Sequence, residues 1–422
     1  MKHFVFVESN TTGTGQLAVQ RLVAQGDRVT FLTRSRAKYP FLASPDSGIQ
    51  VKELDTNSLP TLLVALRAIG EDENIDAVLT FSEFYVCIVA QLAAVFGLAG
   101  LNPIAAQTCR HKPTTRETLR NAGLLTPDFH LLGAKEDARE LADTVSYPCV
   151  VKPPSDSSSH GVRLVRNRAE FLAHCHLIRG WKENVRGQLL NGAVLVESFL
   201  DGPEYSVETM TLSDGTTSVI GVTDKHLSSP PHFVEMGHDF PSRASEPIKQ
   251  ALAHTVLQAL AAVKFNFGPA HTEIRWTTRG PVVIEINPRL AGGMIPELIS
   301  YATGIDLLQV WLDLLLGRSV DLVPKRHGIA SIRFLTAQQA GQIREMSGMQ
   351  RARGIPSVRE ISISRNAGAS VRPAEDAYDR FGFVIASGLD ADVVTGDVSK
   401  ALETIRIEIE PSELEILAGA AR

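Results

Sequence analysis

The sequence predicts a multidomain protein that mixes α/β and α+β structure. The chain has 422 residues, which corresponds to two or three domains at roughly 100 to 200 residues each. Its composition, 44% hydrophobic and 21% charged, is typical of a folded chain with large cores. The first hundred residues alternate short apolar runs with segments of helical period, whereas later segments are rich in strands bounded by turn residues.

A parallel α/β domain is expected over residues 1–101. Its strands are predicted at His3–Val7, Val29–Leu32, Gln50–Leu54 and Ala77–Phe81, and its helices at Gly15–Gln25, Ser58–Ile69 and Glu83–Phe96. The loop Ser9–Gly15 follows the first strand and is either a plain tight turn or a small-anion site. Gly13 and Gly15 lack the third glycine of a dinucleotide fingerprint, so both interpretations stay open.

Three further segments follow. A helical connector is expected at 102–126, where Gly123 and Pro127 stop the helix. Residues 127–212 predict strands Asp128–Leu132, Cys149–Lys152, Val162–Val165, Ala193–Phe199 and Glu204–Leu212, with helices Glu136–Val145 and Ala169–Arg179. Residues 213–422 predict a long helix from Ser245 to about Phe265, a β-hairpin, helices over Ile295–Leu316, and a last segment, 325–422, with a helix around Val398–Ile405.

The hairpin His271–Arg289 is the most informative stretch. Both halves alternate with period two, so His271, Glu273 and Arg275 share one face, and Val283, Glu285 and Asn287 share a face of the second strand. Thr278–Gly280 fits a three-residue turn with a G1 bulge. That register places Thr277 opposite Pro281 and Glu273 opposite Glu285.

Opposed carboxylates destabilise a sheet, so a positive group is expected between them. With Asn287 on the same face, Glu273 and Glu285 offer hard oxygen ligands suited to Mg²⁺. The alternative is a solvated face with unpaired acids. Arg289 would project where anionic oxygens collect, which suits a carboxylate or a transferring phosphate.

Two upstream segments also carry binding chemistry. An apolar strand ends on Lys152 and is followed by Ser155–Gly161, a small polar loop that can close over phosphates, with Ser158, Ser159 and Gly161 as its contacts, or can be an ordinary surface loop. Between two later strands a break leaves backbone groups for a purine near Glu197 and Leu200, with Glu204 for ribose hydroxyls. Each acid taken alone is more often a solvated surface group.

Together these residues resemble the ATP-grasp superfamily. Lys112, Lys152 with its loop, Glu197–Glu204, and Glu273, Glu285, Asn287 and Arg289 occur in its order and rough spacing, over about Leu101 to Leu316. Within that superfamily the chain looks most like the L-amino acid ligases, which include the bacilysin-type dipeptide synthetases. The resemblance implies an ATP-grasp fold with a pre-grasp domain at 1–101, a central nucleotide-clamping subdomain at 127–212, and a C-terminal metal and substrate domain whose 325–422 segment is lid-like.

The resemblance also implies roles for single residues. Lys112 and Lys152 would contact ATP, while Glu197, Leu200 and Glu204 would hold adenosine. Glu273, Glu285 and Asn287 would ligate two Mg²⁺ ions, for which Mn²⁺ is a possible substitute. Arg289 would steady the acyl phosphate, Glu83 would bind the substrate amine, and His238 would act at the substrate site.

Some positions leave more than one interpretation. His238 taken alone is more often a structural histidine than a ligand. His271 and Arg275, which flank Glu273, are equally compatible with a supporting role beside the metal and with none. Gly292 and Gly293 put no bulky side chain near the acyl site, which indicates room for a larger substrate. His111 stands where the family usually has Asp, which puts the local contact before Lys112 in doubt.

The predicted activity is an ADP-forming ligation of a carboxylic acid, such as an amino acid, to the amine of an amino acid through an acyl phosphate. The alternatives are a carboxylase or purine-pathway ligase on the same fold, and an ATP-binding regulator without turnover. The formal charge of −5 argues against a nucleic-acid partner bound by bulk positive charge. No apolar run reaches the roughly 18 to 20 residues of a membrane span, and the four scattered cysteines show no metal or disulfide spacing. A cytoplasmic protein is therefore expected. The family resemblance also implies a homodimer.

Overall fold

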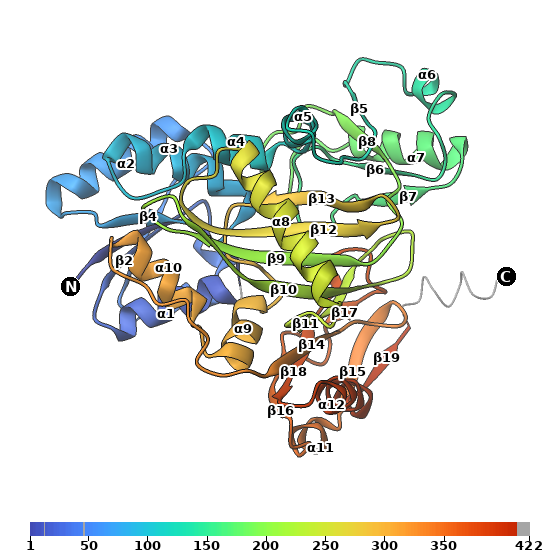
Figure 1. Ribbon diagram of the computed structural model, residues 1–422. Helices are drawn as coiled ribbons and strands as arrows, with labels where there is room; N and C mark the ends of the chain where they lie inside the picture. The colour runs from blue at the N-terminus through green and yellow to red at the C-terminus, as the bar shows by residue number, and fades with distance from the viewer. Residues whose placement is uncertain (12, 45–46, 412–422) are drawn as a thin grey trace.

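The computed structural model describes residues 1–11, 13–44 and 47–411, which form four β-sheets (Figure 1). The N-terminal sheet is parallel, in the order β3-β2-β1-β4, as the alternating pattern predicts. Its elements are β1 His3–Val7, α1 Thr14–Ala24, β2 Arg28–Thr33, β3 Ile49–Glu53, α2 Leu59–Asp72, β4 Ala77–Leu79 and α3 Val86–Phe96. Two details differ from expectation: β4 is shorter, and Glu83 lies in a 3₁₀ turn, Glu83–Tyr85, ahead of α3. Thr12 of the Ser9–Gly15 loop lies outside the described residues.

The connector and the segment after it form a small subdomain. Two helices make the connector, and a four-stranded sheet in the order β5-β8-β6-β7 follows, with the antiparallel pairs β5–β8, β8–β6 and β6–β7. The elements are α4 Pro103–Arg110, α5 Lys112–Asn121, β5 Phe129–Leu132, α6 Ala138–Ala142, β6 Cys149–Lys152, β7 Arg163–Val165, α7 Arg168–Arg179 and β8 Val194–Ser198. Figure 1 shows this subdomain standing above one end of the large sheet.

An eight-stranded antiparallel sheet, in the order β13-β12-β9-β10-β11-β14-β18-β16, forms the body of the protein. Its strands are β9 Glu204–Thr211, β10 Thr217–Leu227, β11 Glu235–Phe240, β12 Gly268–Thr277, β13 Gly280–Asn287, β14 Ile329–Leu335, β16 Val358–Ile363 and β18 Gly382–Gly388. Helix α8 Glu246–Ala262 lies across one face of it and shares a core with strands β9, β10, β12 and β13 (Figure 1). The topology places β9, expected within the central segment 127–212, in this large sheet instead. The domain boundaries themselves stay predictions.

The C-terminal segment continues the large sheet and adds a second, smaller sheet in the order β17-β15-β19. Its further elements are β15 Gly341–Ser347, α11 Met349–Arg353, β17 Ser370–Val371, α12 Ala391–Thr404 and β19 Arg406–Glu410. Helix α12 begins seven residues before the expected Val398, because Asp390 caps it by accepting from two backbone amides. Residues 412–422 of the expected 325–422 subdomain lie outside the described residues.

The hairpin register is partly as expected. Glu273 does pair with Glu285, but Thr277 pairs with Gly280 rather than Pro281, so the turn holds two residues and not three. A bulge at Ile284 restores the predicted pairing further along, because Ile274 pairs with Val283 and Glu273 with Glu285. The bulge also moves Val283 into the core beside α8, away from the face of Glu285 on which it was expected.

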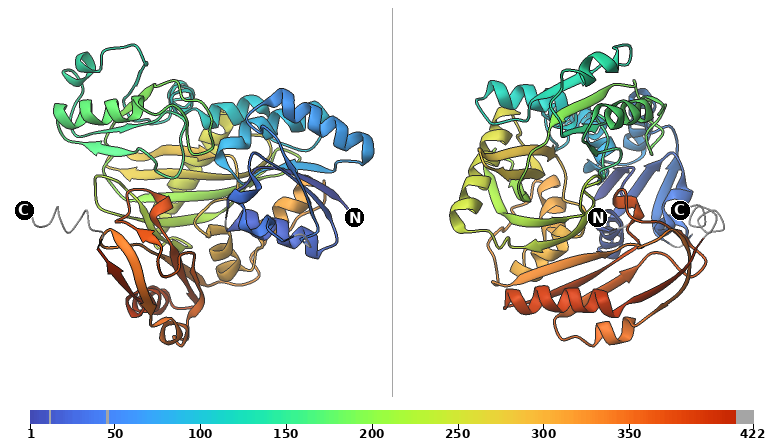
Figure 2. Two further views of the ribbon diagram at one scale, coloured as in Figure 1. Left: turned by 180° about the vertical axis from the view of Figure 1, so that it is seen from behind. Right: turned by 90° about the vertical axis from the view of Figure 1, so that its right-hand side faces the viewer.

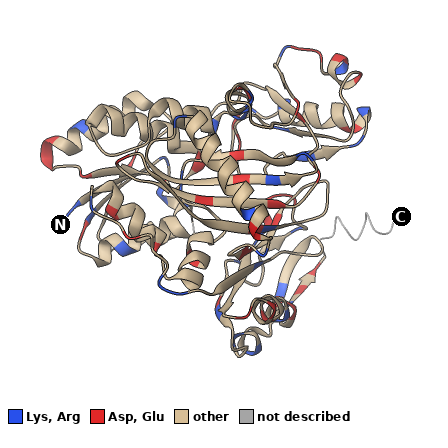
Figure 3. Cartoon of the chain, viewed as in Figure 1, with Lys and Arg blue, Asp and Glu red and all other residues tan. Residues whose placement is uncertain are grey.

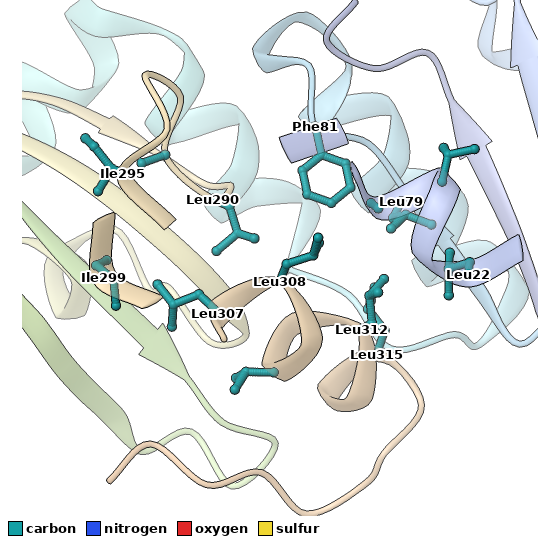
Figure 4. Packing of buried hydrophobic residues seen from close by; sticks show 14 of the residues in the cluster. Leu22, Leu79, Phe81, Leu290, Ile295, Ile299, Leu307, Leu308, Leu312 and Leu315 are labelled. Carbon is teal, nitrogen blue, oxygen red and sulfur yellow. The ribbon is translucent and has the colours of Figure 1, made fainter. Parts of the chain in front are cut away.

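One hydrophobic core joins the N-terminal domain to helices α9 Ile295–Thr303 and α10 Leu307–Leu315. Figure 4 shows Leu22, Leu79 and Phe81 of the N-terminal domain packed against Leu308 and its neighbours on α10. The views in Figure 2 place the N-terminal sheet beside the large sheet. Phe81, on the loop after β4, and Leu290, which follows β13, both belong to this core, so burial of their apolar surface holds the two segments together.

Among the described residues no single helix is long and apolar enough to cross a membrane. The pair α9 and α10 meets the criterion only when taken together, by length and composition alone, and it is bent by 107°.

Candidate active site

A cavity of about 1320 Å³, open to solvent, lies between the small subdomain and the large sheet. Most of the predicted cofactor-binding and metal-binding residues line it. Those that do are Lys112, Lys152, Ser158, Ser159, Glu197, Leu200, Glu204, Glu273, Glu285, Asn287, Arg289, Gly292 and Gly293. We call this space the first cavity.

Glu197 lies at the floor of the first cavity between two cations. Its carboxylate pairs with Lys152 Nζ at 2.6 Å and with Arg116 Nε at 2.8 Å. Burial raises the pKa of Glu197, but Arg116 and Lys152 outweigh burial and hold it at about 2. Arg116 is fully buried and also donates from Nη2 to the carbonyl of Ile284 at 2.5 Å, so it ties Glu197 to the hairpin bulge.

The two opposed carboxylates of the hairpin, Glu273 and Glu285, each pair with a lysine, which offsets the repulsion between them. Lys112 Nζ lies 2.6 Å from Glu285 Oε1 and donates to the Asp156 carbonyl at 3.1 Å. Lys225 Nζ lies 3.0 Å from Glu273 Oε2. The positive groups expected between the acids are therefore present, and one of them, Lys225, was not predicted.

Lys225 lies at the centre of a buried cluster of charges. Besides Glu273, its ammonium reaches Glu204 at 2.9 Å and Glu235 at 3.0 Å. Burial lowers the pKa of Lys225, but the three carboxylates outweigh burial and raise it well above its usual range. Figure 3 shows acidic and basic residues together on the strands of the large sheet.

His271 and Arg275 support the same cluster from β12. His271 Nδ1 lies 2.8 Å from Glu208 and Nε2 lies 3.5 Å from Glu273. Burial lowers the pKa of His271, but the two carboxylates outweigh burial and raise it to about 9. Arg275 pairs with Glu204 at 2.9 Å and donates to the Leu200 carbonyl at 2.7 Å, so it fixes the strand break.

The oxygen donors suit a hard cation. Glu273, Glu285 and Asn287 lie on paired strands with His271 opposite Asn287, and all three line the first cavity. Within the described residues no three His, Cys, Asp or Glu side chains form a ready metal site, so the amide of Asn287 has to complete the set.

The Ser155–Gly161 loop covers the first cavity and touches the C-terminal segment. Ser158 and Ser159 have positive φ angles of 62° and 58°. The Ala377 amide donates to the Ser158 carbonyl at 3.2 Å. Gly161 does not line the first cavity. A Cβ at this position would lie 2.6 Å from Trp181, so packing accounts for this glycine.

A second cavity, about 1870 Å³ and open to solvent, lies on the N-terminal side of the first. The residues that line both are Ser157, Ser158, Arg289, Gly292, Gly293, Ala377 and Arg380. Glu83 lines the second cavity and forms an ion pair with Arg289 Nε at 2.7 Å. Two positions that lie far apart in the sequence thus meet where the cavities join.

His238 lies behind this junction and lines neither cavity. It is fully buried, and neither ring nitrogen has a hydrogen-bond partner among the described residues. Burial lowers its pKa to about 3, so the ring is neutral. A Cβ at Gly293 would lie 2.6 Å from His238 Nε2, so this glycine is what lets the histidine approach the junction.

Comparison with known proteins finds two domain matches. Residues 145–297 match the ATP-grasp domain, and residues 333–410 match the L-amino acid ligase C-terminal domain 2. The chain carries an ATP-grasp domain. The resemblance to the L-amino acid ligases inferred from sequence is confirmed by the second match.

Individual relatives agree with this assignment. An uncharacterized protein of Sinorhizobium fredii, y4rH, is 29% identical over 97% of this chain and 84% of its own length. Alanine–anticapsin ligase of Bacillus subtilis is 26% identical over 66% of this chain, but the match spans only 62% of that ligase.

Solved structures share the fold. An L-amino acid ligase from Bacillus licheniformis aligns with a TM-score of 0.82 at 22% identity, over 97% of this chain and 99% of that one. The biotin carboxylase domain of 2-oxoglutarate carboxylase from Hydrogenobacter thermophilus, in complex with MgADP and bicarbonate, aligns with a TM-score of 0.71 at 17% identity, over 97% and 91% of the two chains. The predicted ATP-grasp fold is confirmed.

Sequence reasoning missed two cations that hold the site together. Arg116 stands on α5, one turn after Lys112, and Lys225 stands on β10. Both stand beside other charged residues, Arg116 next to Glu117 and Lys225 next to Asp224, so the local sequence does not single out either one.

Proposed function

We propose that this protein is an ATP-dependent carboxylate–amine ligase. It joins an amino acid or a related carboxylic acid to the amine of an amino acid, through an acyl phosphate, and releases ADP and phosphate. The observation that carries this proposal is the junction at Arg289, where a cavity lined by lysines and hairpin carboxylates opens into one that contains Glu83. The alanine–anticapsin ligase and L-amino acid ligase relatives support it.

In this proposal the first cavity holds Mg-ATP. Lys112 and Lys152 offset charge on the phosphates, and the loop with Ser158 and Ser159 covers them with hydroxyls and amides. Glu197, Leu200 and Glu204 hold the adenosine.

Glu273, Glu285 and Asn287 would hold two Mg²⁺ ions, for which Mn²⁺ could substitute. The bound ions would neutralise charge on the phosphates. The lysines that pair with these acids in the structure then become available to phosphate oxygens.

The chemistry needs little covalent help from the protein. A carboxylate oxygen of the first substrate attacks the γ-phosphorus, the bond to the β-phosphate oxygen breaks, and ADP leaves. An amine nitrogen then attacks the acyl carbon, the bond to phosphate breaks, and the amine loses a proton. Arg289 holds the oxyanions that develop, and the Ser155–Gly161 loop keeps water from the acyl phosphate.

His238 does not act as an acid or base in this scheme. Its neutral ring, buried against Gly293, gives the substrate end of the site its shape.

The decisive experiment measures phosphate release from Mg-ATP with the twenty amino acids in pairs, followed by mass spectrometry of the positive wells. A signal that needs two amino acids, with a dipeptide mass and ADP rather than AMP, is expected. Glu285→Ala should abolish that signal, whereas Glu246→Gln, which changes an exposed acid on α8, should not. A folded Glu285→Ala protein with wild-type turnover would refute the assignment of Glu285.

Glu83 provides a second test. Because it would recognise an ammonium group, Glu83→Ala should raise the amino-acid KM far more than the ATP KM. Equal effects on both constants would remove Glu83 from that role.

A carboxylase or purine-pathway ligase is the alternative that the structural matches favour, since one solved relative is a biotin carboxylase domain with bicarbonate bound. Turnover with bicarbonate and without amino acids would establish it. ATP binding without turnover under any mixture would favour a regulator. Light scattering of the purified protein tests the predicted homodimer.

A further inference from the structure

The second cavity is lined by three acids and three arginines. The acids are Glu83, Glu297 and Glu360, and the cations are Arg186, Arg289 and Arg380. Because the numbers are equal, the contacts of the arginines decide which acids are left without a cation.

Each arginine has a partner that is not Glu297 or Glu360. Arg289 pairs with Glu83 at 2.7 Å. Arg380 pairs with Glu235 at 3.3 Å and its guanidinium lies 4.0 Å from the centre of the Phe334 ring. Arg186 donates to the Ser9 carbonyl at 2.8 Å and to the Tyr39 hydroxyl at 3.0 Å, and that hydroxyl in turn contacts the buried Glu8.

Glu297 is therefore left without a cation among the described residues. Its Oε1 accepts only a long hydrogen bond, 3.5 Å, from the Thr14 hydroxyl. Its Oε2 is buried and has no hydrogen-bond partner within the described part of the chain. A buried carboxylate oxygen without a partner costs free energy, so a site that keeps one is suited to a ligand that donates to it.

The second acid faces the same space. Glu360 lines the second cavity from β16 and forms no ion pair in the described part of the chain. Burial, together with the neighbouring Glu360 charge, raises the pKa of Glu297 to about 7. Two carboxylates that repel one another gain most from a cation placed between them.

The position of Glu297 indicates which part of a substrate would reach it. Helix α9 begins at Ile295, directly after Gly292 and Gly293, so Glu297 lies in its first turn, beyond the junction with Arg289. A substrate whose α-carbon groups lie at Glu83 and Arg289 would extend its side chain along the cavity toward Glu297. The open space at Gly292, where a Cβ would meet nothing within 4 Å, leaves room for that side chain.

We propose that the second cavity selects an amino-acid substrate with a cationic side chain, an amine or a guanidinium, held by Glu297 and Glu360. The proposal rests on the proposed ligase function and names the substrate class of the same site. It predicts preference for arginine or lysine over uncharged molecules of equal length.

The test compares arginine with citrulline, and lysine with norleucine, as one of the two amino acids in the phosphate-release assay. The wild-type protein should show a KM at least tenfold lower for the basic member of each pair. In Glu297→Gln that KM should rise at least tenfold and the preference should disappear, while the ATP KM changes less than twofold. Glu246→Gln, on the outer helix α8, changes net charge equally and should keep the preference. A wild-type protein that uses the uncharged members equally well, or prefers acidic amino acids, would overturn the proposal.

A binding measurement separates this proposal from the ligase function. Calorimetric titration of arginine and of citrulline into the protein with Mg-ADP does not require turnover. If no amino acid pair is joined but arginine binds and Glu297→Gln removes that binding, the ligase function fails and the substrate class stands. If amino acids are joined without preference for the basic ones, the ligase function stands and this proposal fails.

Discussion

Replacing Arg116 with methionine tests how the floor of the first cavity is held together. Arg116 is fully buried, and it supplies one of the two cations on Glu197 as well as the hydrogen bond to Ile284. Methionine keeps much of the volume and removes the charge. The variant leaves Glu197 with Lys152 alone, at 2.6 Å.

The structure gives the size of the effect. A carboxyl group held at a pKa of about 2, against an ordinary value of 4.5, reflects roughly 3 kcal/mol of preference for its charged form. Removing one partner of a buried ion pair typically costs about 3 to 5 kcal/mol. We expect Arg116→Met to lower the unfolding free energy by that amount and to raise the ATP KM.

Urea denaturation followed by tryptophan fluorescence measures the loss, with Arg120→Met as the matched control. Arg120 lies one turn further along α5, where its guanidinium makes only long hydrogen bonds near Thr126 and stacks over Phe129, so its loss should stay below about 1 kcal/mol.

The double variant Arg116→Met/Glu197→Gln makes the reasoning refutable. Because the two side chains are directly paired, its loss should be smaller than the sum of the two single losses by about 1 to 3 kcal/mol. Additive losses, or an Arg116→Met protein as stable as the Arg120 control, would show that the buried pair does not hold this part of the site.

Three other perturbations have defined outcomes. Gly293→Ala should reduce turnover at least tenfold, while Gly292→Ala should change it little. Only the substitution at Gly293 places a Cβ 2.6 Å from His238 and at a φ of +60°. Similar turnover in the two variants would contradict this. Glu297→Gln should raise the melting temperature at pH 8 but not at pH 4.5. The pKa of Glu297 is about 7 in the folded protein and 4.5 ordinarily, so the wild-type fold loses roughly 3 kcal/mol of stability as the pH rises from 4.5 to 7. That stability is not regained at higher pH. Equal pH profiles of melting temperature would contradict this. Lys225→Met should lower the melting temperature, because three carboxylates lose their shared cation. For the same reason Mg²⁺ alone should stabilise the variant more than the wild type. Melting temperatures measured with and without Mg²⁺ check both results.

The hairpin shows why part of the site could be predicted from sequence. The structure has the predicted Glu273–Glu285 pairing, although the three-residue turn from which that register was predicted is wrong. A shorter turn and a bulge at Ile284 shift the register in opposite directions and cancel. The consecutive apolar residues Val282 and Val283 hide the bulge, because either can face the core.

The partners of the hairpin acids could not be predicted in the same way. Lys225 reaches Glu204, Glu235 and Glu273 from three strands, and the pairing of those strands depends on the order of the whole eight-stranded sheet. Local periodicity determines which face a side chain occupies but not which distant strand lies beside it. Arg116 and its contact with Glu197 were missed for the same reason.

The two cavities differ in how their charges are balanced, and that difference bears on what each can bind. In the first cavity the five glutamates are each paired with a lysine, so a polyanion with its own metal ions can enter by exchanging partners. In the second, Glu297 keeps a buried oxygen that has no partner among the residues the structure describes, so an anion there would add repulsion whereas a cation would reduce it. Arg289 lines both cavities where they meet and is paired there with Glu83. A molecule that carries a carboxylate at one end and a positive charge at the other matches that order of charges along the path from Arg289 to Glu297.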